Sequence, residues 1–234
     1  MPADRLLVKA PSIGGQIAVD PNMPQPLSPH RLEAFSDGVI AVIITIMVLE
    51  LRVPSKPISD LDGLRQILPS LIVYLLSFVQ TGIYWVNHHY LTDKLEHVTH
   101  AILWSNLGLL FFLSLIPFAT RWVGMRGVSS FSIALYALTC ALPAIAWSVL
   151  STVIRRHKRQ ASASSFSKQA ISSALYLSAI PAAFLAPNFA PNIGPTLALS
   201  MIALVALLWL IPPRTIAEQT QITPAGEHSH NDQR

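Results

Sequence analysis

The chain has 234 residues, of which 52% are hydrophobic and 12% are charged, and its formal net charge is +4. A typical soluble domain has roughly 25% charged residues, so this composition indicates a membrane protein. The excess of cations is small and does not indicate a nucleic-acid partner, and a lone cysteine, Cys140, excludes an internal disulfide.

The two ends of the chain differ from its centre. Residues 1–28 contain no continuous apolar segment that could serve as a signal peptide, and they predict a flexible cytoplasmic tail. Residues 214–234 are polar and predict a second flexible cytoplasmic tail. Residues 29–213 predict an all-α membrane protein domain with six transmembrane helices, since about 20 apolar residues cross a bilayer. The expected spans are 31–52, 66–88, 100–121, 129–154, 169–187 and 195–212.

Two prolines predict details of these helices. Ser28 followed by Pro29 predicts the start of the first helix, because Ser can cap free amide groups and Pro suits the first helical position. Pro117 predicts a kink in the last turns of the third helix, because proline has no amide hydrogen to donate.

The positions of Lys and Arg predict the orientation of the chain. With the N-terminus in the cytoplasm, most of the cations fall on the inner side, including the basic segment 155–159, which reads as a juxtamembrane anchor at the lipid surface. We therefore expect a multi-pass protein of the cell membrane with both termini in the cytoplasm.

The first predicted helix carries a carboxylate. Asp37 follows Ser36 within an apolar segment, and a carboxylate costs about 3 kcal/mol at the centre of a membrane helix and less near its end. Such a residue usually has a function. Trp85, His88 and His89 share one face of the second helix, with Asn87 beside them, and we expect these residues to be the partners of Ser36 and Asp37.

Another face of the first helix has a regular pattern. We call this face the stripe, and it comprises Phe35, Gly38, Val42, Thr45 and Leu49. At 100° per residue, these five residues fall within about 80° of one another around the helix, and Arg31 lies on the same line. The pattern suits the wall of a narrow pore formed by several copies, and it also suits ordinary helix packing.

Three segments resemble a known family. Arg31, Phe35-Ser36-Asp37-Gly38, Thr45 and Leu49 resemble the R-x-x-x-F-S-D signature of the transmembrane protein 175 family of potassium channels. The segment YWVNHH at 84–89 and the segment NLGLLFFLSLIPFAT at 106–120 resemble the second and third helices of that family.

The resemblance implies a potassium-selective cation channel without a cofactor, built as a homotetramer whose first helix lines a central pore. It places a hydrophobic constriction at Val42, a hydroxyl layer at Thr45 and a second apolar ring at Leu49. Val42 is shorter than the Ile or Leu that is usual at this position. A positioning network for the pore helix is expected to comprise Arg31, Phe35, Ser36, Asp37, Trp85, Asn87, His88 and His89.

Two other functions compete with a channel. A proton-coupled transporter would use Asp37 with His88 or His89 as titrating groups, but the sequence has no inverted repeat of the kind such transporters show. A membrane enzyme would need a nucleophile, a set of metal ligands or a phosphate-binding loop, and the sequence has none of these patterns. We therefore expect that the protein is not an enzyme.

Overall fold

The computed structural model describes residues 28–51, 59–93, 95–158, 163–185, 190 and 192–210. Within these ranges the chain is all helical. The helices are α1 (Pro29–Leu49), α2 (Asp60–Thr92), α3 (His100–Leu113), α4 (Ile116–Arg126), α5 (Ser130–Lys158), α6 (Ala163–Ala182) and α7 (Ile193–Leu210). The predicted tails, 1–28 and 214–234, lie outside the described residues except for Ser28.

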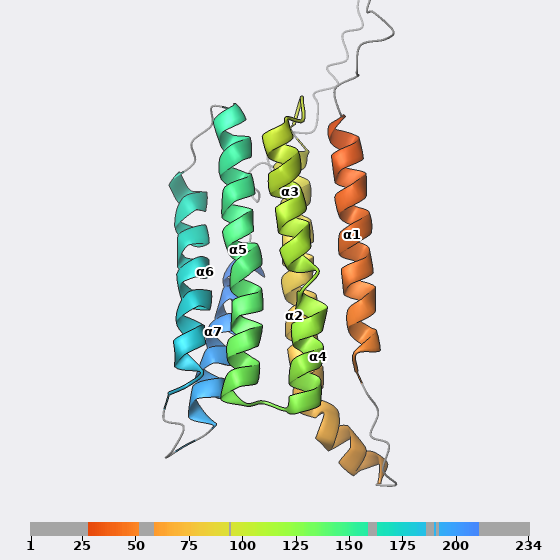
Figure 1. Cartoon of the computed structure of the whole chain (residues 1–234), viewed down its shortest axis with the longest axis vertical. Helices are drawn as coiled ribbons and strands as arrows, with labels where there is room; N and C mark the ends of the chain where they lie inside the picture. Colours follow the sequence, from red (N-terminus) through yellow and green to blue (C-terminus); the bar gives the residue numbers. More distant parts are fainter. Residues whose placement is uncertain are drawn as a thin grey trace, which may run out of the picture.

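The seven described helices form six rods that run parallel or antiparallel to one another. Helices α3 and α4 count as one rod, because they follow one another along the same line (Figure 1). Together α3 and α4 make one broken span, His100–Arg126, and five of the six rods are long and apolar enough to cross a membrane. The remaining rod, α6, packs against α5 and α7. The prediction of an all-α protein with six transmembrane helices is thus confirmed.

The two proline-based predictions have different outcomes. The third span does break near Pro117, since α3 ends at Leu113 and α4 starts at Ile116. The first helix does start at Pro29, but the Ser28 side chain makes no capping hydrogen bond, so the expected capping role of Ser28 is wrong. Pro29, which needs no acceptor for its nitrogen, is sufficient to start the helix there.

Helix α5 is the centre of the bundle and α1 lies at its edge (Figure 1). In the apolar window of α5, 67% of the residues are buried inside the subunit, against 28% for α1. One apolar core joins α5 to α2, α4, α6 and α7, and a second joins it to α1 and α3. A single subunit therefore covers only one side of α1.

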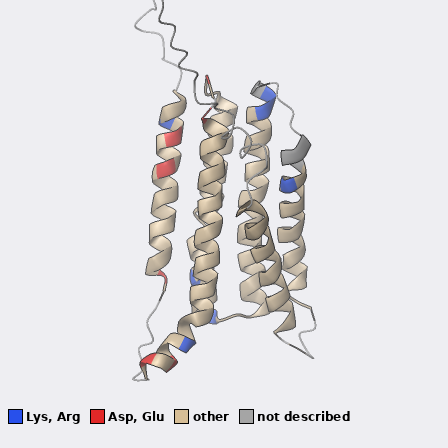
Figure 2. Ribbon diagram, turned by 180° about the vertical axis from the view of Figure 1, so that it is seen from behind, with Lys and Arg blue, Asp and Glu red and all other residues tan. Residues whose placement is uncertain are grey.

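Charged residues gather near the two ends of the bundle, and the helices between are almost free of them (Figure 2). This distribution suits an apolar membrane interior with polar surfaces on both sides. It supports the description of the chain as a multi-pass membrane protein.

The junction between α6 and α7 requires a glycine. A Cβ atom built on Gly194 would lie 2.5 Å from the carbonyl oxygen of Ala183 and 2.9 Å from that of Ala182. These atoms belong to the backbone and cannot turn aside. We expect Gly194→Ala to lower the free energy of unfolding by about 1–3 kcal/mol, the usual cost of overpacking, measurable as a lower melting temperature in detergent.

Gly82→Ala is the matched control, because a Cβ at Gly82 of α2 meets no atom within 4 Å. Its melting temperature should equal or exceed that of the wild type, since alanine favours a helix over glycine. Equal melting temperatures for Gly194→Ala and the wild type would contradict the close approach of α6 and α7.

Candidate functional site

The two faces of α1 have opposite environments. Its buried residues repeat at helical spacing and pack against α2, α3 and α4; they are Leu32, Ser36, Ile40, Ile43 and Met47. The stripe lies on the other side, and all five of its members are exposed in the single subunit. The exposed fraction is 53% for Phe35, 54% for Val42 and 76% for Leu49.

The hydroxyl of Thr45 has a fixed orientation. Its hydrogen points to the backbone of its own helix, where the carbonyl oxygens of Val42 and Ala41 lie 2.9 Å and 3.0 Å away. The lone pairs of Oγ1 therefore face away from α1. An oxygen held in this way can act as an acceptor or as a ligand for a cation.

An open groove runs beside the stripe. Its walls are residues of α1, among them Phe35, Gly38 and Val42, and the residues Ser114 and Pro117 at the break between α3 and α4. Pro117 has no amide hydrogen, so the turn at the break is not a regular helix. Irregular backbone and the stripe thus border the same groove.

Buried hydrogen bonds hold α1 against α2 and α3. Asn106 of α3 donates from Nδ2 to Ser36 Oγ at 2.9 Å, and its Oδ1 lies 2.8 Å from His88 Nε2 of α2. All three side chains are fully buried. Ser36 Oγ also donates to the carbonyl oxygen of Leu32 at 2.8 Å, which completes its hydrogen bonding. One amide therefore connects three helices.

A second set of contacts lies on the adjacent face of α1. Trp85 Nε1 donates to Asp37 Oδ1 at 2.9 Å, and His89 Nδ1 lies 2.6 Å from Glu33 Oε1. Because Glu33 and Asp37 are one turn apart, both carboxylates face α2 together.

The far end of α1 is also tied to the bundle. Arg121 Nε of α4 lies 3.4 Å from Glu50 Oε2, directly after the last turn of α1. Polar contacts at both ends of α1 therefore oppose its rotation.

The structure places the eight expected network residues in four groups. Asp37 and Trp85 are in direct contact, as described above. His89 contacts Glu33, and not Ser36 or Asp37 as expected. Ser36 and His88 share Asn106 and do not bond to each other. Three others have no hydrogen bond to another helix within the described part of the chain: Arg31 and Phe35 are exposed, and Asn87 donates to the carbonyl oxygen of Ile83 in its own helix.

Two residues of this site were not predicted from the sequence. Asn106 is the one amide side chain within the apolar helix α3, which was a sufficient reason to expect a buried partner for it. Glu33 lies one turn before Asp37, and the same helical geometry that places Asp37 would have placed Glu33 against α2. Within the ranges that the structure describes, no group of three His, Cys, Asp or Glu side chains could hold a metal ion.

The contribution of Asn106 to the packing of α1 against α2 and α3 can be tested directly. Asn106→Leu leaves Ser36 and His88 without their shared partner, and we expect a loss of about 1–2 kcal/mol in the free energy of unfolding, the upper range for hydrogen bonds between membrane helices. The measurement is a melting curve of the purified protein in detergent.

Ser105→Ala is the control for this variant. Ser105 is the residue before Asn106, and its hydroxyl donates only to carbonyl oxygens of its own helix. Its melting curve should match that of the wild type. A wild-type curve for Asn106→Leu as well would show that the buried amide does not hold α1.

Comparisons with known proteins connect this geometry to a family. Residues 31–117 match the family model described as endosomal/lysosomal potassium channel TMEM175. A potassium channel from Chryseobacterium sp. (strain P1-3) is 43% identical over 192 residues, which cover 80% of this chain and 94% of that protein. The chain belongs to the TMEM175 family.

Other TMEM175 relatives support this assignment. The crystal structure of a lysosomal potassium-selective channel TMEM175 homolog from Chamaesiphon minutus superposes with a TM-score of 0.64 at 27% identity, and the match covers 78% of this chain and 96% of that one. The human endosomal/lysosomal proton channel TMEM175 is 32% identical over 105 residues, which are 41% of this chain and 21% of that protein. The matched segment 31–117 includes α2, α3, all of α1 except its first two residues, and every site residue described above except Arg121.

Proposed function

We propose that this protein is a potassium-selective channel in which four identical subunits surround a pore lined by α1. The observation that carries the proposal is the outward orientation of the stripe on a helix whose opposite face is fixed by buried hydrogen bonds. The bacterial relative that the chain covers almost completely is named a potassium channel, which agrees with this function.

The apolar side chains of the stripe supply the constriction. Val42 and Leu49 offer no ligand to an ion, so a ring of either side chain is a hydrophobic barrier that an ion passes only when the ring is wetted or when the ion loses part of its water. Hydrophobic constrictions of this kind can also gate a pore by dewetting. Potassium loses its water more easily than sodium, which favours its passage.

Thr45 lies one turn from Val42 and supplies oxygen next to the apolar ring. Its hydrogen is directed to its own helix, so four copies would present four hydroxyl oxygens toward the axis. These oxygens would replace part of the lost hydration. The resulting selectivity is modest, because apolar side chains form the narrowest ring.

The irregular backbone between α3 and α4 is a second reason to place the stripe face of α1 next to the pore axis. Irregular backbone at membrane depth is tolerated where it is covered by protein or lines a water-filled cavity, and not where it meets lipid. Ser114, at the break, is exposed in the single subunit and borders the groove beside the stripe. A neighbouring subunit or pore water would cover it.

The cation distribution supports an orientation with both termini in the cytoplasm of the cell, and the protein in the cell membrane. In this orientation, Glu33, Asp37 and their partners on α2 lie near the cytoplasmic end of the pore. The exposed apolar side chains on the other helices would contact lipid.

A series of substitutions at Val42 tests the constriction. We expect Val42→Ala to raise potassium flux into liposomes severalfold and to weaken discrimination against sodium, because the ring becomes wider. Val42→Trp should abolish flux, because four indoles would fill the axis. The measurement is flux driven by a potassium gradient with equal pH on both sides.

Val48→Ala is the control, since Val48 is also exposed on α1 but lies off the stripe. Its flux should equal that of the wild type. Flux that required a pH gradient and disappeared in Asp37→Asn would instead indicate the proton-coupled transporter, with Asp37 and His88 or His89 as its titrating groups.

The symmetry axis can be located by cross-linking. In a Cys140→Ala background, we expect Val42→Cys to form disulfide-linked dimers under mild oxidation, because copies of residue 42 meet around the axis. Native mass spectrometry of the same sample should give four subunits per particle.

Val48→Cys provides the comparison, because the same thiol chemistry on another face of α1 should leave monomers on a denaturing gel. Efficient cross-linking at residue 48 with none at residue 42 would show that the stripe faces away from the symmetry axis, and this would contradict the proposed pore.

A further inference from the structure

Cations gather where α5 ends and α6 begins. We call this set the α5–α6 cluster, and the sequence places its members between residues 155 and 168: Arg155, Arg156, Lys158, Arg159 and Lys168. The described cations of this set lie at the same end of the bundle as the start of α1 (Figures 1 and 2). In the orientation proposed above, this end faces the cytoplasm.

No carboxylate on the surrounding helices balances the α5–α6 cluster. Between Glu96 and Glu218 the sequence has no Asp or Glu, so helices α3 to α7 carry none. The carboxylates of α1, Glu33 and Asp37, are in contact with α2. Like charges repel one another, so the cluster favours an anion that comes from outside these helices.

Arg155 is held at the junction of the two helices. With its amide oxygen turned toward the neighbouring donors, the buried Gln169 of α6 accepts from Arg155 Nη2 at 3.1 Å and from Trp147 Nε1 at 3.3 Å. Lys168 is the residue before Gln169, so a cation of α6 lies next to this contact. The two helices therefore present their cations side by side.

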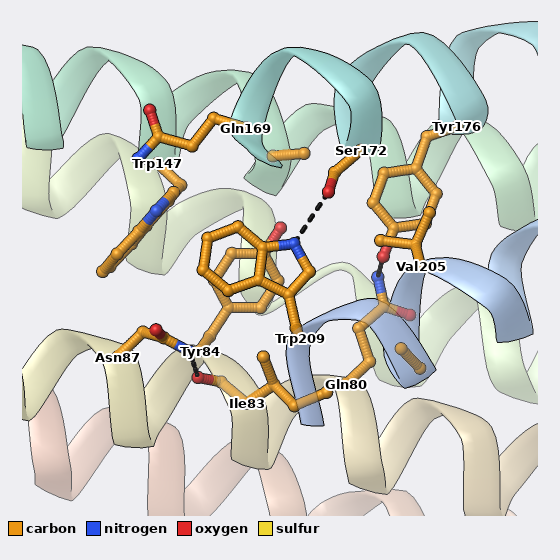
Figure 3. A pocket seen from close by; sticks show the side chains of 12 residues that line it. Gln80, Ile83, Tyr84, Asn87, Trp147, Gln169, Ser172, Tyr176, Val205 and Trp209 are labelled. Carbon is orange, nitrogen blue, oxygen red and sulfur yellow. Dashed lines mark hydrogen bonds between the residues drawn. The ribbon is translucent and has the colours of Figure 1, made fainter. Parts of the chain in front are cut away.

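Gln169 and Trp147 also line a small cavity between α2, α5, α6 and α7 (Figure 3). Its volume is about 30 Å³, and a single water molecule needs about 10–15 Å³ on this measure. The cavity thus has room for a water molecule or two and for no larger guest. A ligand of the α5–α6 cluster has to bind on the outer surface of the two helices.

The outer surface next to the cluster is apolar. On α5, the exposed residues Arg156, Val149 and Ile145 share one face, at spacings of seven and four residues. On α6, the exposed Ile171 lies one turn after Lys168. The apolar span of α5 ends at Arg156, which places the cations at the depth of lipid headgroups and the apolar side chains at the depth of acyl chains.

We propose that the α5–α6 cluster binds the phosphate headgroup of an anionic phospholipid, whose acyl chains lie along the exposed faces of α5 and α6. Guanidinium groups suit this partner, because their planar fork matches phosphate oxygens. A zwitterionic headgroup would bring a cation of its own and is disfavoured. The site is separate from the stripe, and its existence does not depend on ion conduction.

The test titrates delipidated protein in detergent with phosphatidylglycerol, or with phosphatidylcholine of the same acyl chains, and counts bound lipids by native mass spectrometry. Phosphatidylglycerol should bind about tenfold more tightly. Arg156→Gln should weaken its binding about fivefold, and Arg156→Gln with Lys168→Gln about twenty-fivefold, as expected for one and two cations at an anionic surface. The binding of phosphatidylcholine should not change.

The matched control is Arg65→Gln with Arg126→Gln, which removes two exposed cations at the other end of the bundle. It should bind phosphatidylglycerol as the wild type does. Equal losses in the two double variants would reflect net charge alone, and equal affinity for the two lipids would show no choice of headgroup. Either result would overturn the proposal.

Two further measurements complete the test. Glycerol 3-phosphate carries the phosphate without acyl chains and should not displace the lipid, and displacement would assign the α5–α6 cluster to a soluble phosphate compound and overturn the lipid site. Arg156→Gln alone keeps the test decisive if the double variant does not fold, because the Arg156 side chain is exposed.

Discussion

A polar side chain inside a membrane must find its hydrogen bonds within the protein, because hydrocarbon offers none. Ser36 meets this requirement through Asn106, and Asn106 meets it through both Ser36 and His88. Asn106 bonds to both Ser36 and His88 at one rotation of α1 about its axis, while the buried His88 Nδ1 has no hydrogen-bond partner among the described residues. The rest of the site follows from that rotation, since it fixes which side chains of α1 remain outside the subunit.

The subunit combines a well-packed part with a lightly packed one. Helix α5 is surrounded by α3, α4, α6 and α7, whereas α1 is covered on one side only. Helix α2 belongs to both parts: Trp85 and His88 face α1 and α3, while Tyr84 and Asn87 face α5, α6 and α7. Neighbouring residues of one helical turn therefore face two different sides of the subunit.

The sequence predicted the spans well, because the length and apolar character of each segment are local properties that do not depend on packing. Pro117 likewise predicted the break, since the missing amide hydrogen acts within its own helix. The partners were harder to predict. A helical wheel gives the direction of Ser36 or Asn87 on one helix, but it does not give the height at which a neighbouring helix presents its own side chains. For this reason the sequence grouped Asn87 with His88, although the structure turns these adjacent residues to different sides of α2.

The side chains of the stripe lie outside the buried core of their own subunit, and this has a consequence for how freely these positions can change. Exchange of one exposed side chain for another leaves the monomer's core intact, so natural variation at these positions is not limited by the folding of the chain. The outer face of α1 can therefore change in shape while the buried contacts that hold the helix in place stay the same.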